Sequence, residues 1–270
     1  MTEDRITGKL RRLAPLIGDD CAIVSAPAGK DLLFTTDLTI EGIHFTRDAP
    51  AGQVGHRALL RGLSDIAAMG GTPRYCLVSL ALAPWTSEKW IDGFYRGLLH
   101  LAGQHKTKLA GGDLSHASQV VADIFVCGIT PAGKALKRSG ARPGDGIWVT
   151  GALGGWKNRH DPEPRLAMGR KLRDRATACM DLTDGLVLDL HRLCLASGVS
   201  GEIESVPLLK NATLDQALFD GEDYELLFTS RQRRNPGVRI GSILKGEPGR
   251  ILYQGQALEP KGYDHFQSRP

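Results

Sequence analysis

Five short segments of the chain place carboxylates beside glycines, hydroxyls or other carboxylates. They are Gly18-Asp19-Asp20, Thr35-Thr36-Asp37, Ser64-Asp65, Gly111-Gly112-Asp113 and Asp181-Leu182-Thr183-Asp184-Gly185. Two carboxylates about 4 Å apart repel by roughly 4 kcal/mol at an effective dielectric constant near 20, so several can gather only around bound cations. Hard oxygen ligands suit magnesium, and magnesium held by carboxylates usually holds substrate phosphates as well. The pattern therefore predicts a magnesium site that serves nucleotide chemistry.

Asp65 lies within an expected helix over residues 53–69, which Gly70-Gly71 brings to a stop. Apolar residues line one side of this helix, and the side that carries Asp65 also holds small or apolar neighbours such as Gly62 and Met69. We therefore expect Asp65 to be half-buried, and a buried carboxylate needs a partner. The alternative is an exposed helical carboxylate.

Asp181 and Asp184 precede an expected helix from about Gly185 to Ser197. Taken alone, the pair is better interpreted as an N-cap with an acidic first turn. Two neighbours favour a functional role: Gly185 lets a ligand approach the backbone, and Thr183 offers a hydroxyl near a helix N-terminus, where phosphate oxygens are favoured. Capping and ligand binding can both hold.

The remaining motifs are ambiguous by themselves. Gly111-Gly112-Asp113 follows a short expected strand and fits either a tight turn or a phosphate-cradling loop with an adjacent metal ligand. His44 has no histidine partner at a metal-binding spacing. The sequence also lacks the P-loop, the protein-kinase signature set, G-x-G-x-x-G and G-x-S-x-G. Phosphoryl transfer would therefore have to be organised by metals rather than by a P-loop lysine.

Composition limits the class of protein. The 270 residues carry a net charge of +4 and are 41% apolar, which suits one large or two smaller globular domains. The basic clusters have no interleaved aromatic residues, so we expect no nucleic-acid partner. The five cysteines are far apart and form no C-x-x-C pair, which is typical of buried thiols in a reducing compartment. The N-terminus is charged and no apolar stretch is long enough to span a membrane, so we expect a cytoplasmic protein.

Strand and helix patterns mix without strict alternation, so the sequence favours an α+β fold over a doubly wound parallel sheet. Gly140, Pro143 and Gly144 cluster where the pattern begins afresh. We therefore expect two domains, residues 1–138 and residues 139–270, each with a sheet and helices.

Taken together, the motifs resemble one family, thiamine-monophosphate kinase, in the superfamily of aminoimidazole ribonucleotide synthetase. The resemblance runs in order from Ile17 to Phe266 and rests on IGDDCAIV, TTDLTIEGIHF, ALLRGLSDIAAMGGTPRY, AGGDLS, KRSGARPGDGIWVTGALG, ACMDLTDGL, DGEDYELLFT and KGYDHF. Each stretch is modest, but eight in family order are specific.

The resemblance implies transfer of the γ-phosphoryl group of ATP to thiamine phosphate, with several Mg²⁺ ions and no covalent nucleophile. It also implies a homodimer, in which residues 1–138 form an ATP- and metal-binding domain that pairs its sheet with a second subunit. The implied metal ligands are Asp20, Thr36, Asp37, Asp65, Asp113, Asp181 and Asp184. The implied ATP contacts are Gly111, Gly112, Arg138 and Thr183, and those for thiamine phosphate are His44 and Glu222.

Three departures from the family pattern bear on substrate affinity. The chain lacks the helix that normally follows the Gly151–Gly154 turn, Pro260 replaces an aromatic residue, and Asp220 replaces a glycine. Two rival hypotheses follow. One is a non-catalytic module that binds nucleotide and magnesium, and the other is a ligase like aminoimidazole ribonucleotide synthetase.

Overall fold

The computed structural model describes residues 19–26, 29–155, 162–264 and 266. The first half of the chain forms a five-stranded sheet in the order β1-β2-β5-β3-β4, antiparallel except for the β3–β4 pair. The strands are β1 (Ala22–Ala26), β2 (Lys30–Ile40), β3 (Thr72–Leu82), β4 (Lys108–His116) and β5 (Val121–Pro131). On β5 the residues alternate between buried and half-buried positions along the whole strand. Such alternation is typical of a sheet that packs one face on a core.

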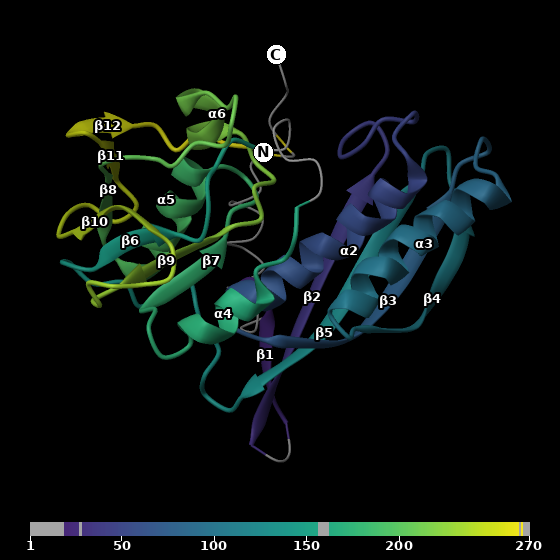
Figure 1. The fold of residues 1–270 in the computed structure, drawn as a ribbon, viewed down its shortest axis with the longest axis horizontal. Coiled ribbons are helices and arrows are strands. Elements are labelled where there is room, and N and C mark those ends of the chain that lie inside the picture. Colours follow the sequence, from purple (N-terminus) through teal and green to yellow (C-terminus); the bar gives the residue numbers. More distant parts are fainter. Residues whose placement is uncertain (1–18, 27–28, 156–161, 265, 267–270) are drawn as a thin grey trace.

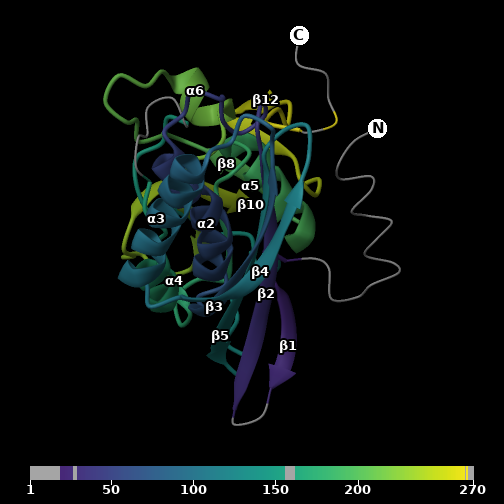
Figure 2. The ribbon, with the colours of Figure 1, turned by 90° about the vertical axis from the view of Figure 1, so that its right-hand side faces the viewer.

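Two helices, α2 (Ala51–Ala68) and α3 (Glu88–Gln104), cover one face of this sheet (Figure 2). They approach closely because glycines line their contact. A Cβ on Gly55 would lie 1.9 Å from the carbonyl oxygen of Phe94, and one on Gly97 would lie 1.8 Å from that of Gly52. Ser87 is the N-cap of α3, since its side chain accepts a hydrogen bond from the Trp90 N–H.

The second half forms a seven-stranded sheet in the order β12-β11-β8-β10-β6-β9-β7, in which only β8 and β11 pair in parallel. Helices α5 and α6 pack against its buried residues (Figure 1). The strands are β6 (Gly146–Val149), β7 (Ala178–Asp181), β8 (Ser200–Ile203), β9 (Leu226–Ser230), β10 (Val238–Leu244), β11 (Ile251–Tyr253) and β12 (Gln256–Leu258). The helices are α4 (Leu166–Leu172), α5 (Leu186–Ser197) and α6 (Leu214–Phe219).

Helix α2 joins the two halves, because its C-terminal end packs against α4 and β7 as well as against the first sheet (Figure 1). The contact with α4 is tight: a Cβ on Gly169 would lie 1.9 Å from the carbonyl oxygen of Ala67. One hydrophobic core runs through this junction and includes Leu63 of α2 together with Cys179 and Phe228 of the second sheet. The end of α2 is therefore held rigidly between the sheets.

The predicted α+β class is confirmed by these two mixed sheets and their helices, and the division at residues 138/139 stays a prediction. The five cysteines are free; Cys127 is half-buried and the other four are buried. No helix in the described ranges is both long and apolar enough to cross a membrane.

Candidate active site

Three predicted ligands, Asp20, Asp65 and Asp181, meet where α2 joins the two halves. Each contributes one carboxylate oxygen, and the three oxygens lie within 4.8 Å of one another. Asp20 precedes β1, Asp65 lies in the last turn of α2, and Asp181 ends β7. Asp65 is half-buried, as its helix pattern predicted, and the other two are buried. Segments far apart in the sequence thus supply one carboxylate cluster.

Neighbouring donors orient these three carboxylates. Thr35 donates to Asp65, Ser64 Oγ donates to Asp181 Oδ2 over 2.5 Å, and Arg138 pairs with Asp20 Oδ1 at 2.9 Å. Burial, reinforced by repulsion from neighbouring aspartates, raises the pKa of both Asp65 and Asp181 well above the ordinary range. One arginine does not neutralise three carboxylates, so the cluster has the electrostatics of a cation site.

Asp37 lies near this cluster on β2. It shares a face of the strand with Thr35, since side chains alternate along a strand, and burial and nearby carboxylates raise its pKa. The side chain of Thr36 points to the opposite face, where it donates a hydrogen bond to Asp123. The ligand role assigned to Thr36 stays a prediction.

The segment 181–185 is held by α5 and not by its own carboxylates. Asp189 of α5 is fully buried, and its Oδ2 accepts the backbone N–H groups of Thr183 (3.0 Å) and Asp184 (3.1 Å). Burial and the nearby Asp184 raise the pKa of Asp189 to about 7. The N-cap of α5 is Gly185, which has no side-chain cap, and Asp184 pairs with Arg192. The capping interpretation of Asp181 and Asp184 is therefore wrong.

Gly111, Gly112 and Asp113 lie within β4, at the edge of the first sheet, so the tight-turn interpretation is also wrong. Backbone approach explains one glycine, because a Cβ on Gly112 would lie 1.9 Å from the carbonyl oxygen of Val78. All three residues are exposed and border a separate shallow pocket. The structure does not bring Asp113 into the cluster of Asp20, Asp65 and Asp181.

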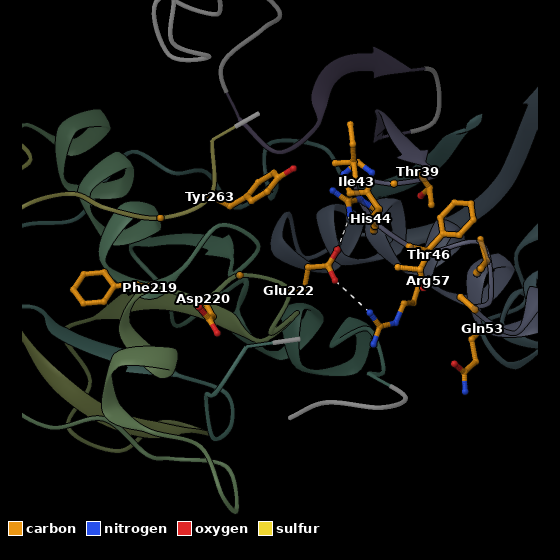
Figure 3. Close-up of a pocket in the computed structure, with 17 residues that line it drawn as sticks. Thr39, Ile43, His44, Thr46, Gln53, Arg57, Phe219, Asp220, Glu222 and Tyr263 are labelled. Carbon is orange, nitrogen blue, oxygen red and sulfur yellow. Dashed lines mark hydrogen bonds and ion pairs between the residues drawn. The ribbon is translucent and has the colours of Figure 1, made fainter. Parts of the chain in front are cut away.

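A cavity of about 720 Å³ opens where α2 faces the second half. His44 lines it from the segment after β2, and Glu222 lines it from the segment before β9, so both predicted substrate residues border one space. Figure 3 shows Glu222 and Tyr263 facing Ile43 and His44 across the cavity. Its walls combine apolar and aromatic side chains with a few charged groups, as ligand pockets usually do.

The sequence motifs did not single out three cavity residues, Arg57, Arg61 and Tyr263. Arg57, Arg61 and Asp65 follow one another at four-residue spacing on α2, which places them along one helix face. That spacing is a signal that the sequence did contain. Arg57 Nη1 lies 3.3 Å from Glu222 Oε2, and Arg61 Nη1 lies 2.9 Å from Glu222 Oε1.

The three departures from the family pattern have different outcomes. Pro260 is exposed and does not line the cavity, whereas the aromatic ring of Tyr263 does. Asp220 borders the cavity. The shortened segment after Gly154 falls mostly on residues 156–161, outside the described residues.

Known proteins resemble this one over almost the whole length of the chain. Residues 18–133 match the family model described as AIR synthase related protein, N-terminal domain. The thiamine-monophosphate kinases of Aquifex aeolicus and Salmonella typhimurium are 33% and 32% identical; the alignments cover 93% and 97% of this chain and 93% and 95% of those proteins.

Among solved structures, AaThiL complexed with AMPPCP and TMP superposes with a TM-score of 0.91 at 31% sequence identity, covering 98% of this chain and 97% of that one. The order of motifs, the fold and the extent of these matches agree. The chain therefore belongs to the thiamine-monophosphate kinase family.

Proposed function

We propose that this protein transfers the γ-phosphoryl group of ATP to thiamine phosphate, which gives thiamine diphosphate and ADP. One observation carries the proposal: the cluster of Asp20, Asp65 and Asp181 lies at the end of α2, and the same helix lines a ligand-sized cavity. Family membership supports the same reaction, because a family relative is known in complex with AMPPCP and TMP.

The donor set fits magnesium. The cluster contains carboxylate oxygens only, and the flanking groups Thr35 and Ser64 donate hydrogen bonds to them. Such hard oxygen ligands suit Mg²⁺ better than zinc or copper. We propose Asp20, Asp37, Asp65, Asp181 and Asp184 as ligands in this chain, with Thr36 and Asp113 as further candidates. When bound, Mg²⁺ would neutralise and orient polyphosphate oxygens.

The residues of the chain then act by positioning. The transition state of phosphoryl transfer is loose and spreads negative charge over several oxygens, so orientation and cations matter more than a nucleophilic side chain. Arg138 is held by Asp20, with its backbone N–H bound to Asp19, and can present its remaining donors to phosphate oxygens. We propose that Arg138 and Thr183 contact ATP, together with Gly111 and Gly112.

We also propose a homodimer in which the outer face of the first sheet meets the same face of a second copy. That face carries exposed large apolar side chains, and the helices among the described residues cover the opposite face. Exposed apolar patches of this kind mark interaction sites. The residues concerned are Leu38 on β2 and Tyr75 and Leu77 on β3.

The test is direct turnover by the purified protein. ATP, Mg²⁺ and thiamine phosphate should give thiamine diphosphate and ADP in equal amounts, and a chelator should stop the reaction. Calorimetry with ATP and magnesium runs beside the assay. Nucleotide binding without product would overturn the kinase in favour of a non-catalytic module. Product from the substrate of aminoimidazole ribonucleotide synthetase, and none from thiamine phosphate, would favour a ligase.

A further inference from the structure

Arg61 occupies the boundary between the cavity and the carboxylates. Its Nη1 lies 2.9 Å from Glu222 on the cavity side, and its Nε lies 4.0 Å from Asp37 Oδ1 on the other side. Its side chain is only 17% exposed. A group bound at Arg61 would therefore be in contact with the cavity and close to the aspartates at the same time.

Two buried atoms at this boundary lack hydrogen-bond partners. Within the described residues, Arg61 Nε finds no acceptor and Asp37 Oδ2 finds no donor. Buried polar groups in native proteins are almost always satisfied. The free donor on Arg61 can bind an anion, and the free acceptor on Asp37 can bind a cation. Such a pair of atoms is expected in a site that binds an anion next to a cation.

The charges around Arg61 allow it to exchange partners. Asp37, Glu222 and Asp184 face it from β2, the segment before β9 and the segment before α5, and the phenol of Tyr224 lies nearby. Burial alone would lower the pKa of Arg61, but these groups hold it above the ordinary range. Arg57 shares Glu222 with it. The guanidinium therefore stays charged, and its planar fork matches phosphate oxygens.

We propose that Arg61 binds the phosphate of the acceptor substrate, and that the Arg61–Glu222 ion pair opens to receive a ligand with one negative and one positive charge. This inference rests on the proposed function, because thiamine phosphate carries a phosphate monoester and a cationic thiazolium ring. Glu222 then faces the ring cation while Arg61 faces the phosphate. Separating a half-buried ion pair is costly unless both charges find new partners, so a ligand with only one of the two charges is disfavoured.

The exchange also orients the substrate. With its phosphate on Arg61, the ligand directs the reacting oxygens toward Asp37 and the aspartate cluster. Its rings remain in the part of the cavity that Phe45 and Tyr263 line. Arg61 is thus assigned as the residue that selects the phosphorylated form of the vitamin and presents it for transfer.

The test measures how much the phosphate adds to binding. Calorimetry gives the dissociation constants of thiamine phosphate and of thiamine for the wild-type protein, Arg61→Gln and Glu222→Gln. We expect wild-type protein to bind thiamine phosphate more tightly, and Arg61→Gln to lose about 10- to 100-fold of that preference. Glu222→Gln should weaken the binding of both ligands and keep the preference for thiamine phosphate. Turnover should show a raised KM for thiamine phosphate in Arg61→Gln with the KM for ATP unchanged.

Two further variants make the result decisive. Arg96→Gln removes an exposed arginine of α3 and should leave the dissociation constants of both ligands and the KM values unchanged. Arg61→Lys keeps the charge without the fork and should retain part of the preference, which covers the case in which Arg61→Gln folds poorly. The assignment is overturned if Arg61→Gln keeps the full preference, or weakens thiamine and thiamine phosphate equally. A wild-type protein that prefers thiamine phosphate but forms no product would overturn the proposed function and leave the binding result on Arg61 standing.

Discussion

The aspartate cluster illustrates how a functional site opposes stability at the level of single residues. Asp20, Asp65 and Asp181 converge in a buried region, and burial with mutual repulsion raises the pKa of Asp65 and Asp181. Strain of this kind persists only when the surrounding structure holds it in place. Here the end of α2 is fixed by packing on both sheets. The fold thus holds together charges that would separate in water.

We therefore expect Asp65→Asn to separate stability from activity. The substitution removes one like charge, and an amide oxygen can still accept the hydrogen bond from Thr35. Without metal, the variant should melt at the same temperature as the wild type or higher. It should lose most of the stabilisation that Mg²⁺ gives the wild type, and its turnover should vanish. Thermal unfolding with and without Mg²⁺ measures this; a normal rate would mean that Asp65 is not a ligand.

The sequence could indicate some site residues and not others. Asp65 could be identified from the sequence because helical periodicity placed it among apolar neighbours, and its half-burial is confirmed. Arg61 received no role, since nothing local to the sequence shows that Glu222 lies beside it. The resemblance implied Thr36 as a ligand, whereas strand parity places Thr35, and not Thr36, on the same face of β2 as Asp37. Contacts between distant segments are the information that periodicity lacks.

Among the structural elements, the loop 181–185 depends on α5. Asp189→Asn should destabilise the protein by about 1–3 kcal/mol, because a neutral amide oxygen accepts the two backbone N–H groups more weakly than a carboxylate oxygen and the new NH₂ group places a donor beside Arg192. Turnover should fall as well, since the loop carries Asp181 and Asp184. Urea unfolding measures the first effect. Asp92→Asn, at an exposed position on α3, is the control and should change neither stability nor turnover. Equal stabilities of Asp189→Asn and the wild type would contradict the role of Asp189 in holding the loop.

The contact between α2 and α3 allows a second test at this scale. Gly55→Ala would place a methyl group 1.9 Å from the carbonyl oxygen of Phe94, so the helices must move apart at a cost of about 1–3 kcal/mol. Gly103→Ala on α3 meets nothing within 4 Å and should stabilise by up to about 1 kcal/mol through helix propensity. Opposite signs in urea unfolding support the packing argument, and the same sign for both variants contradicts it.

The long helices were predictable, whereas some short elements were not. The helix expected over residues 53–69 appears as α2 at Ala51–Ala68. The helix expected from about Gly185 to Ser197 appears as α5 at Leu186–Ser197, and Gly198 follows it in the left-handed conformation. Helix α6 and strands β11 and β12 were missed, because three to six residues are too few to reveal a period. Gly111-Gly112 resembled a turn and is part of β4, since glycines also serve close strand approach.

At the scale of the whole molecule, the first sheet is covered on one face only. Helices α2 and α3 bury the inner face, while Leu77, 40% exposed, lies on the outer face, over which the described residues place no second layer. A sheet normally buries its apolar face against another element. In the proposed homodimer, a second copy of the same chain would supply such a layer with twofold symmetry.

We expect the protein to sediment as a dimer at micromolar concentration. Leu77→Asp should shift it to a monomer, because the new carboxylate would be buried without a partner in the interface between the two copies. Leu195→Asp is the matched control: this leucine is 55% exposed on α5, away from the first sheet, so its substitution should leave the dimer intact. Sedimentation velocity measures both. A wild-type monomer, or dissociation by both variants alike, would contradict the sheet-face interface.

Turnover of the Leu77→Asp monomer tests whether Gly111, Gly112 and Asp113 act across the dimer. These residues lie outside the aspartate cluster of their own chain. If they act on the second subunit, the monomer should retain its fold and lose activity.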